Sequence, residues 1–348
     1  GLEAGASGLG APRRFAAPAP PSLEETGPSE GPFPIGEVAL PATAGASRAL
    51  RFGERAAREA IAAAGWSELE VADPSCLLVI ASTKGALDVG EAALAGRAAP
   101  ERVTEGLLFA LAPRLAEVLG HVGPRITLSL ACASGLSAVG FARAALAAGE
   151  ARRALVVGAD AATEFVYTGF ASLRALDPEG ARPFDARRRG LSLGEGGAAV
   201  ALATGPGPVE IAGYGASNDA HHITGPARDG RGLARALREA LSEARLEGPD
   251  VGLGILHGTA TAFNDHMESV AYASAVGPAA FPVASVKGAV GHLLGAAGLV
   301  NLAVCKTALE RGRCPPNVGL RELDPALRLD VVKAASRPIA TDAALTSA

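Results

Sequence analysis

The chain has 348 residues, of which 49% are hydrophobic and 4% aromatic, and its formal net charge is −4. This length suits two domains or one duplicated domain with a large core, and the weak negative charge lacks the basic footprint of a nucleic-acid-binding protein. The most apolar tract spans 289–304 but contains His292, Asn301 and several glycines. It predicts a buried helix rather than a membrane span.

Cysteine usage favours a reducing compartment. The four cysteines are Cys76, Cys132, Cys305 and Cys314. Their spacing forms neither a CxxC pair nor a disulfide framework, and no signal peptide is visible, so we expect a cytoplasmic protein. We expect no metal site, because His221 and His222 have no cysteine or carboxylate at ligand spacing. The sequence opens with Gly and stops at IATDAALTSA, so we expect a chain that is cut at both ends.

The first half of the chain predicts alternating strands and helices after a loop-rich start over 1–45. Short apolar runs predict buried strands, and segments with helical spacing that end in glycine predict helices. Helices are expected over 47–65, 104–120 and 134–149, strands over 76–82, 126–131 and 154–160, and an adjacent strand pair over 197–204 and 209–215. The stretch 164–190 is expected to be mainly loop. The run GEGG at 194–197 is interpreted as a tight turn, because it lacks the spacing of a phosphate-binding loop.

The alternation of strands and helices starts again in the second half of the chain. Helices are expected over 231–244 and 292–311, and strands over 252–256, 281–285 and 327–332, the last of these being the final strand. Because strands and helices alternate in both halves, we predict α/β layering. The identity between the halves is too weak to prove a repeat, but the restart favours a duplicated fold with a boundary near residue 205.

Cys132 lies where an apolar strand run meets a helix of small residues, in ITLSLACASGLSAVGFARAAL. A strand-to-helix turn exposes a side chain above the sheet, and the free N–H groups and dipole of a helix N-terminus stabilise a thiolate. The small neighbours Ala131, Ala133, Ser134 and Gly135 leave room for a substrate. Cys132 is therefore a candidate nucleophile, and a buried structural cysteine is the alternative.

Two later segments place polar groups beside apolar runs. His257 ends the strand run GLGIL and opens HGTATAFNDHMES, a polar loop at a strand end, where α/β folds keep their sites. Lys287 lies in SVKGAVGH, where a buried ammonium would need a partner such as Glu268 or Asp265. His292 opens the following helix. The alternatives are a structural histidine and a lysine that extends to solvent.

The order of these motifs resembles that of the elongating β-ketoacyl-[acyl-carrier-protein] synthases, over nearly the whole chain. ACASG around Cys132 matches the family's cysteine motif, HGTATAFND matches HGTGTxxxD with Ala260 in place of a small Gly or Ser, and SVKGAVGH matches SxKxxxGH. RPFDARRRGLSLGEGG matches RPFDxxRDGFxxGEGAG, although Arg189 replaces the Asp and Leu191 replaces the Phe. PPN at 315–317 also fits.

The resemblance implies a thiolase-like duplicated αβαβα layered fold. The half over 1–205 would carry the nucleophilic cysteine, and the half over 206–348, apparently truncated at its end, would carry the two histidines and the lysine. The implied reaction is a decarboxylative condensation, in which Cys132 holds an acyl chain as a thioester and malonyl carrier protein supplies the carbanion. His257 and His292 would donate hydrogen bonds to the enolate.

The remaining site residues follow from the same resemblance. Lys287 would hold charge beside the histidines, with Glu268 as its ion-pair partner. Asp265 would support the loop after His257. Thr259 and Thr261 would bind the phosphopantetheine arm of the carrier protein.

The resemblance also implies the partners of the chain. Substrates would arrive on the phosphopantetheine of acyl carrier protein, no cofactor of the chain's own is expected, and the protein would be a homodimer with no affinity for nucleic acid or membranes. Four arginines near the expected entrance are candidates for steering the acidic carrier, ordinary solvated arginines being the alternative. They are Arg48, Arg51, Arg187 and Arg188.

Several alternatives stay open. Thiolases would need a second reactive cysteine, and Cys305 and Cys314 lack the Gly-rich setting. Chain-initiating synthases use Cys, His and Asn, whereas His292 stands here as the third residue. A chain-length-factor-like partner subunit usually loses the nucleophile, which this chain retains at Cys132. An inactive fragment is the last alternative, because the family's GFGGTN-like loop with its gating Phe does not appear before TDAALTSA. Fatty-acid and polyketide synthases share every motif, so the acyl chain stays undetermined.

Overall fold

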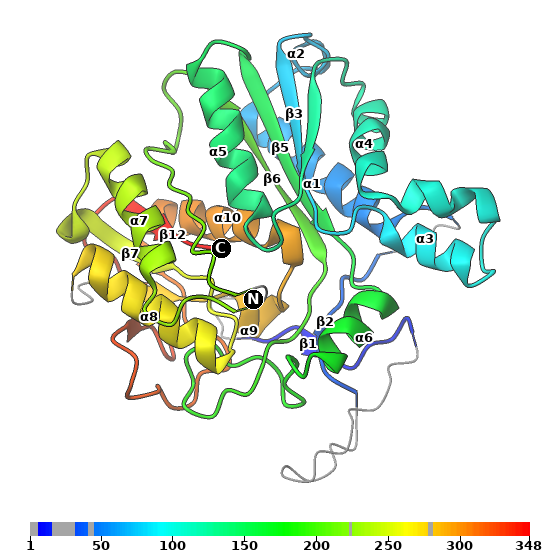
Figure 1. The fold of residues 1–348 in the computed structure, drawn as a ribbon. Coiled ribbons are helices and arrows are strands. Elements are labelled where there is room, and N and C mark those ends of the chain that lie inside the picture. The colour runs from blue at the N-terminus through cyan, green and yellow to red at the C-terminus, as the bar shows by residue number, and fades with distance from the viewer. Residues whose placement is uncertain (1–5, 16–31, 41–44, 223–224, 278–280) are drawn as a thin grey trace.

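The computed structural model describes residues 6–15, 32–40, 45–222, 225–277 and 281–348 (Figure 1). Two sheets alternate with three layers of helices, as the expected αβαβα fold requires. The outer face of the first sheet is covered by α1 (Arg48–Ala64) and α4 (Leu111–Leu119). Between the sheets lie α5 (Ser134–Ala147) and α10 (Ala297–Arg311). The outer face of the second sheet is covered by α7 (Arg231–Ala244) and α8 (Ala262–Val276).

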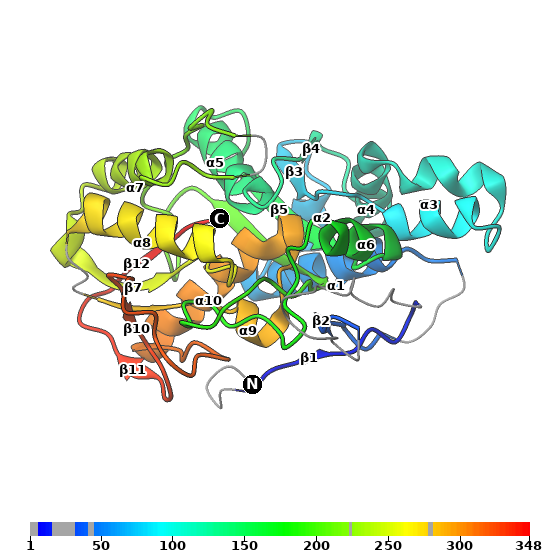
Figure 2. The same cartoon turned by 60° about the horizontal axis from the view of Figure 1, so that its bottom comes forward.

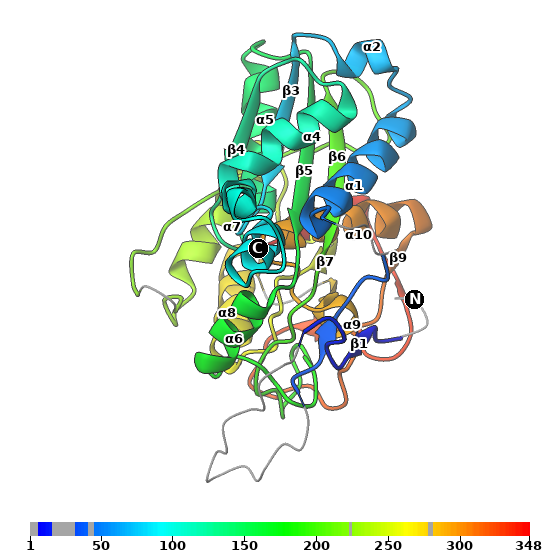
Figure 3. The same cartoon turned by 90° about the vertical axis from the view of Figure 1, so that its right-hand side faces the viewer.

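The first sheet has the order β4-β3-β5-β6 and contains the strands β4 (Arg125–Leu128), β3 (Cys76–Ala81), β5 (Arg153–Asp160) and β6 (Gly196–Ala203). Its strands are parallel except β6, which runs antiparallel to β5. Side chains of β3 alternate between the faces, so that Leu78 and Ile80 pack toward α1 and α4 while Leu77 and Val79 pack toward α5. Figure 3 shows α1 and α5 on opposite sides of this sheet.

The second sheet has the order β10-β8-β7-β12, with every neighbouring pair parallel. Its strands are β10 (Asp330–Val331), β8 (Pro282–Ala284), β7 (Val251–Ile255) and β12 (Ala343–Thr346). Helices α7 and α8 lie side by side on its outer face (Figures 1 and 2). The carboxyl ends of parallel strands meet at one edge of a sheet, so residues that follow β3, β4 and β5, or β7 and β8, are brought together.

The two central helices touch each other through glycines. A Cβ atom on Gly135 of α5 would lie 3.0 Å from the backbone nitrogen of Leu299 in α10, and one on Gly298 of α10 would lie 2.8 Å from the side chain of Leu136 in α5. Only residues without side chains allow this close approach. The crossing brings the N-terminal ends of both helices, and with them Cys132 and His292, to one place.

Shorter elements complete the described part of the chain. They are β1 (Leu9–Gly10), β2 (Ile35–Gly36), α2 (Glu68–Val71), α3 (Leu87–Leu94), α6 (Glu164–Ser172), α9 (Lys287–Val290), β9 (Arg313–Cys314), β11 (Arg337–Pro338) and 3-10 turns at Pro100–Gly106, Leu108–Ala110, Gly248–Asp250 and Leu294–Ala296. None of the helices within the described ranges is both long and apolar enough to cross a membrane.

Most predicted elements are present, and several predictions were wrong. The stretch 164–190, expected to be mainly loop, is non-helical from 173 onward but opens with α6, which begins after Thr163, whose side chain accepts a hydrogen bond from the N–H of Val166. The loop expected after His257 ends at Thr261, because α8 begins at Ala262. The expected helix over 104–120 is helical only from α4 onward, after two 3-10 turns, and the one expected from 292 begins at α10. The described residues 209–215 form no strand, and β12 follows the strand expected to be last.

The GEGG run is extended rather than a tight turn. Gly194 bridges Gly36 in a parallel arrangement, and β6 begins at Gly196. Glu195 between them is buried and forms ion pairs with Arg14, at 2.7 Å, and with Arg48. The charge of Glu195 therefore has a structural role, because it binds the N-terminal segment and α1 to the first sheet.

Candidate active site

Cys132 lies on a strained turn between β4 and α5. Ala131 has φ of +50°, in the left-handed region that non-glycine residues rarely adopt. The Ser134 hydroxyl closes this turn, because it accepts a hydrogen bond from the N–H of Leu130 at 2.8 Å and donates one to the carbonyl of Ala131 at 2.6 Å. The turn therefore presents the partly exposed thiol of Cys132 beyond the end of the sheet.

The structure brings together three residues that are far apart in sequence. The Sγ atom of Cys132 lies 2.9 Å from Nε2 of His292. The rings of His257 and His292 are edge to face, with centroids 5.2 Å apart and an interplanar angle of 84°. The thiol and one nitrogen of each ring lie within 4.8 Å of one another. This is the constellation that the sequence motifs predicted.

The surroundings of His292 fix which ring nitrogen carries the proton. The N–H of Leu294 donates to Nδ1 at 3.0 Å, so Nδ1 is an acceptor and the neutral ring carries its hydrogen on Nε2, facing Cys132. The backbone of His292 is held by residues 192–194, because its N–H donates to the carbonyl of Ser192 and its carbonyl accepts from the N–H of Gly194. His292 is thus aimed as a hydrogen-bond donor at the sulfur.

Lys287 orients His257 in a similar way. Its ammonium donates to the backbone carbonyl of His257 and lies 3.4 Å from Nδ1 of the same residue. With Nδ1 as the acceptor, the neutral ring carries its hydrogen on Nε2. Burial, and then the positive charge of Lys287, hold the pKa values of His257 and His292 well below the usual range, so both rings are neutral donors at neutral pH. Burial lowers the pKa of Lys287 itself to about 8.

Glu268 anchors the backbone of the histidine loop. Its carboxylate accepts from the N–H groups of His257 at 2.7 Å and Gly258 at 2.8 Å and from the hydroxyl of Ser347 at 2.6 Å. The ion pairs between described residues do not include the expected pair of Glu268 with Lys287. The prediction rested on charge alone, whereas these three donors occupy the carboxylate, and Lys287 donates to a carbonyl instead.

Asp265 supports the same loop one helical turn earlier. Its carboxylate accepts from the N–H of Ala260 at 3.2 Å, where φ is +65°, and from the N–H of Phe184 at 2.8 Å. Burial raises the pKa of Asp265 to about 7, although the Phe184 N–H and Arg188 oppose this shift. Thr259 and Thr261 lie in the loop itself, with their hydroxyl oxygens 2.9 Å apart.

Three serines that the sequence analysis did not single out complete the support of the site. Ser134 closes the cysteine turn, Ser285 donates to the carbonyl of Gly258 at 2.9 Å, and Ser347 binds Glu268. Ser134 and Ser285 lie inside motifs, but serine is common in loops, so its presence alone gave no signal. Ser134 binds within its own turn, whereas the partners of Ser285 and Ser347 are 27 and 79 residues away in sequence.

The thiol is less acidic than its place before a helix suggested. Burial raises the pKa of Cys132, and the positive charge of Lys287 is the largest effect that opposes this rise. A desolvated thiolate loses its hydration, and a helix N-terminus offsets only part of that loss. The positive charge of Lys287 therefore favours the thiolate of Cys132.

We expect Lys287→Met to move the alkylation of Cys132 to higher pH. Removing the positive charge removes the effect that lowers the thiol pKa, so less thiolate forms at a given pH. The rate of iodoacetamide reaction as a function of pH measures this midpoint. Lys306→Met is the control, because Lys306 is exposed and paired with Glu310. An unchanged midpoint in Lys287→Met would contradict the assignment.

The four candidate arginines have different environments. Arg188 is buried, with an ion pair to Asp324 at 2.7 Å and a longer one to Asp265 at 3.4 Å, and Arg48 binds Glu195. These internal partners leave Arg188 and Arg48 little capacity to bind a carrier protein. Arg51 lies in α1 beside Arg48. Arg187 has an 80% exposed side chain, 3.8 Å from Glu322, and is the best placed of the four to meet a partner.

One Cys and two His within a few ångströms are also a possible zinc-ligand set. The ammonium of Lys287 lies against His257, however, and its charge would repel a dication at this position. The donor set fits a thiol nucleophile with two hydrogen-bond donors better than a metal.

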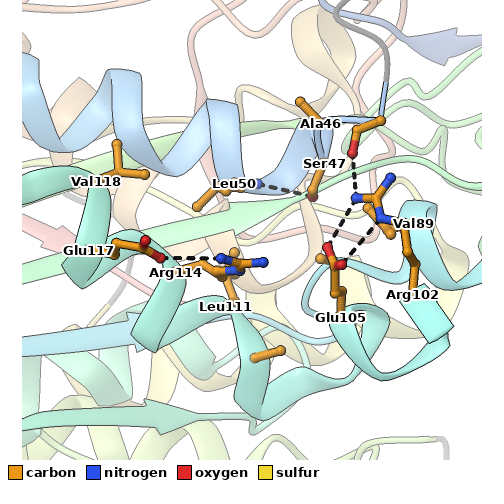
Figure 4. A pocket seen from close by; sticks show the side chains of 13 residues that line it. Ala46, Ser47, Leu50, Val89, Arg102, Glu105, Leu111, Arg114, Glu117 and Val118 are labelled. Carbon is orange, nitrogen blue, oxygen red and sulfur yellow. Dashed lines mark hydrogen bonds and ion pairs between the residues drawn. The ribbon is translucent and has the colours of Figure 1, made fainter.

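A separate pocket lies between α1, α3 and α4, and Cys132 is not among its lining residues (Figure 4). Its charged groups bind each other, since Arg102 pairs with Glu105 at 3.0 Å and Arg114 with Glu117 at 3.2 Å. The pocket therefore offers no free charge that would select a ligand.

The fold and site define a class of protein. The ishigamide ketosynthase/chain length factor structure superposes with a TM-score of 0.84 and 30% identity, covering 98% of this chain and 88% of that one, so the fold is that of the thiolase-like ketosynthases. Family models described as β-ketoacyl synthase, N-terminal domain, and β-ketoacyl synthase, C-terminal domain, match residues 38–205 and 209–321. The chain belongs to the β-ketoacyl synthase family.

Two curated relatives show the range of that family. The 3-oxoacyl-[acyl-carrier-protein] synthase 2 of Synechocystis sp. is 38% identical over 246 residues, which are 66% of this chain and 59% of the relative. The tetracenomycin polyketide synthase ketoacyl synthase alpha subunit of Streptomyces glaucescens is 36% identical over 244 residues, which are 65% of this chain and 57% of the relative. The match therefore spans less than two thirds of the length of either relative.

Proposed function

We propose that the chain is a 3-oxoacyl-[acyl-carrier-protein] synthase, which condenses malonyl carrier protein with an acyl chain held on Cys132. The observation that carries this proposal is the 2.9 Å contact between Cys132 Sγ and His292 Nε2, with the ring of His257 edge-on beside it. A nucleophile and two neutral N–H donors at one point match the needs of acyl transfer followed by decarboxylation.

In the first step the Cys132 thiolate attacks the carbonyl carbon of an acyl thioester. A new carbon–sulfur bond forms, the bond to the carrier's sulfur breaks, and the carrier thiolate leaves and takes up the proton that Cys132 lost. His292 acts here as a hydrogen-bond donor to the sulfur, because its Nε2 already carries the proton and cannot accept another.

In the second step the malonyl thioester loses CO₂, and the electron pair of the broken carbon–carbon bond forms an enolate. The Nε2–H groups of His257 and His292 stabilise the negative oxygen. The enolate carbon then attacks the thioester on Cys132, a carbon–carbon bond forms, and the Cys132 sulfur leaves with its electron pair. The product on the carrier is two carbons longer.

The direct test is a two-stage incubation of the chain with acyl carrier protein loaded with an acyl group, and then with malonyl carrier protein. Intact-protein mass should show one acyl group on the chain, and the carrier should then bear the elongated 3-oxoacyl product. A chain that binds carrier protein but never gains an acyl group would support the alternative of a non-catalytic, chain-length-factor-like partner subunit. The retained thiol at Cys132 disfavours that alternative.

We also propose that the two halves, 1–205 and 206–348, divide the work. The first supplies the nucleophile, and the second supplies His257, His292 and Lys287. The adjoining ends of the two family matches, at residues 205 and 209, support this division. Substrates would arrive on carrier phosphopantetheine, with Thr259 and Thr261 near its thioester and Arg187 toward the carrier. The four free cysteines suit a cytoplasmic setting.

We further propose that the chain pairs through β4 with a second copy or a homologous subunit. The strand lies at the edge of its sheet, and an unpaired edge is a ready template for strand addition. Large apolar side chains are exposed at both ends of the strand, with Val122 63% and Leu130 52% exposed. A partner at this edge would cover both.

We expect Val122→Glu to weaken this pairing at least about tenfold, because a buried unpaired carboxylate opposes association. Sedimentation velocity over a range of concentrations measures the change. Leu69→Glu is the control, since Leu69 is 84% exposed on α2, away from β4. A wild-type chain that stays monomeric, or equal effects of both variants, would refute the interface.

A further inference from the structure

A buried carboxylate beside the active site has no role in the steps above. Asp160 ends β5 and is 0% exposed, and the ion pairs between described residues do not include it. Its charge is met by hydrogen bonds alone. Its Oδ1 accepts from the Ser82 hydroxyl at 2.7 Å and from the N–H groups of Thr83 and Lys84 at 3.1 and 3.2 Å. Its Oδ2 accepts from the N–H of Gly295 at 2.7 Å and from Thr83.

These donors come from two turns that are far apart in sequence. Ser82–Lys84 follow β3, at the carboxyl edge of the first sheet, and Gly295 lies in the 3-10 turn Leu294–Ala296 that leads into α10. A Cβ atom on Gly295 would lie 2.9 Å from Oδ2 of Asp160 and 3.0 Å from Cα of Ser82. The two turns are therefore in close contact, and Asp160 binds both.

The 3-10 turn also controls the ring of His292. The N–H of Leu294, next to Gly295, is the donor that fixes Nδ1 of His292 and so directs Nε2–H at Cys132. A displacement of the turn would release that bond and let the ring rotate or change tautomer. In an active site, a misplacement of about 1 Å can cost about 10²-fold in rate.

We infer that Asp160 is a positioning residue, which holds the turn after His292 against the turn after β3 so that His292 points at Cys132. This inference rests on the proposed condensation for its kinetic effect, but the orientation of the ring can be measured without any substrate.

Asparagine at this position cannot reproduce the bonds. Both oxygens of Asp160 accept from a backbone N–H, Oδ1 from Lys84 and Oδ2 from Gly295. The amide NH₂ of Asn would face an N–H donor in either orientation, so at least one buried donor loses its acceptor. The side-chain volume stays almost unchanged, which makes Asp160→Asn a selective test.

The experiment compares Asp160→Asn with the control Asp177→Asn, since Asp177 is also fully buried and binds Arg182 and Arg189 away from Cys132. We expect kcat for malonyl decarboxylation to fall about 10²-fold in Asp160→Asn, with an almost unchanged KM. In Asp177→Asn we expect kcat and KM to stay within about twofold of the wild-type values. The ring ¹⁵N resonances of His292, assigned with His292→Ala, should shift in Asp160→Asn and stay in place in the control.

The outcomes separate this inference from the proposed function. A wild-type chain without decarboxylation but with a His292 shift in Asp160→Asn would refute the function and keep the positioning role. An Asp160→Asn variant with wild-type resonances and rate would overturn the positioning role. If this variant fails to fold, Ser82→Ala provides the test, because it removes one hydrogen bond to Asp160. We expect kcat to fall about tenfold and the same His292 resonances to shift by a smaller amount. An unchanged kcat with unchanged resonances would refute the inference.

Discussion

Replacing Cys132 with alanine is expected to abolish acyl loading and to lower the rate of condensation by about 10⁴-fold or more, since no other group near the two histidines can form the thioester. The other three cysteines are buried, and burial raises the pKa of Cys76 to about 11 and those of Cys305 and Cys314 to about 12. They are therefore poor nucleophiles at neutral pH. Intact-protein mass after incubation with an acyl carrier protein measures the loading.

Cys76→Ala is the matched control, because it removes a buried thiol from the same half of the chain. It should load as the wild type does. An acyl group that persists on Cys132→Ala would place the nucleophile elsewhere. The decarboxylation of malonyl carrier protein should remain measurable in Cys132→Ala, because the donors for that step are the two histidines.

The second large effect is expected from the histidines. His257→Ala or His292→Ala should each slow malonyl decarboxylation by about 10²–10³-fold, the usual loss when one donor to a developing oxyanion is removed. Acyl loading of Cys132 should fall much less, because in that step His292 only donates a hydrogen bond to the sulfur and no enolate forms. Release of CO₂ measures the first step and intact-protein mass the second.

A control and a pH profile sharpen this test. His266→Ala changes an exposed histidine of the same helix as Asp265 and should leave both steps unchanged. Because the pKa values of His257 and His292 lie well below the ordinary 6.5, the rate of decarboxylation should not fall as pH decreases from 8 to 6.5. Lys287 and Asp265 also titrate over this range, with pKa values of about 8 and about 7. A loss of rate therefore contradicts the neutral donors that the structure indicates only if the ring ¹⁵N resonances of His257 or His292 move to imidazolium positions over the same range.

Much of the site could be predicted because its motifs sit at strand ends. Cys132 follows β4, and His257 follows β7, so the layered fold alone directs them toward one region. The motif order then indicated which histidines would join them. Hydrophobic periodicity also placed most helices and strands, because their buried faces are apolar.

The predictions about the site that were wrong all involve buried polar groups. Helix α8 was interpreted as a loop because its inward face carries Asp265 and Glu268, which bind backbone N–H groups instead of packing as apolar residues. The charge of Glu268 does raise the pKa of Lys287, as the sequence indicated. The two groups form no direct ion pair, because backbone and hydroxyl donors occupy the carboxylate of Glu268. Asp160 gave no signal at the end of its apolar run, since its donors come from turns that no local pattern connects to it.

The contact between α5 and α10 has a consequence for recombining family members. Gly135 and Gly298 allow the helix that follows the nucleophile to touch the helix that follows His292. A chimaera that joins residues 1–205 of one synthase to the second half of another must therefore bring compatible small residues to both sides of this contact. Where larger residues clash at the contact between α5 and α10, the hybrid would keep every catalytic side chain but would separate the Cys132 thiol from the His292 ring. Activity lost in such a hybrid should therefore be restored by substitutions at this helix contact rather than in the active site.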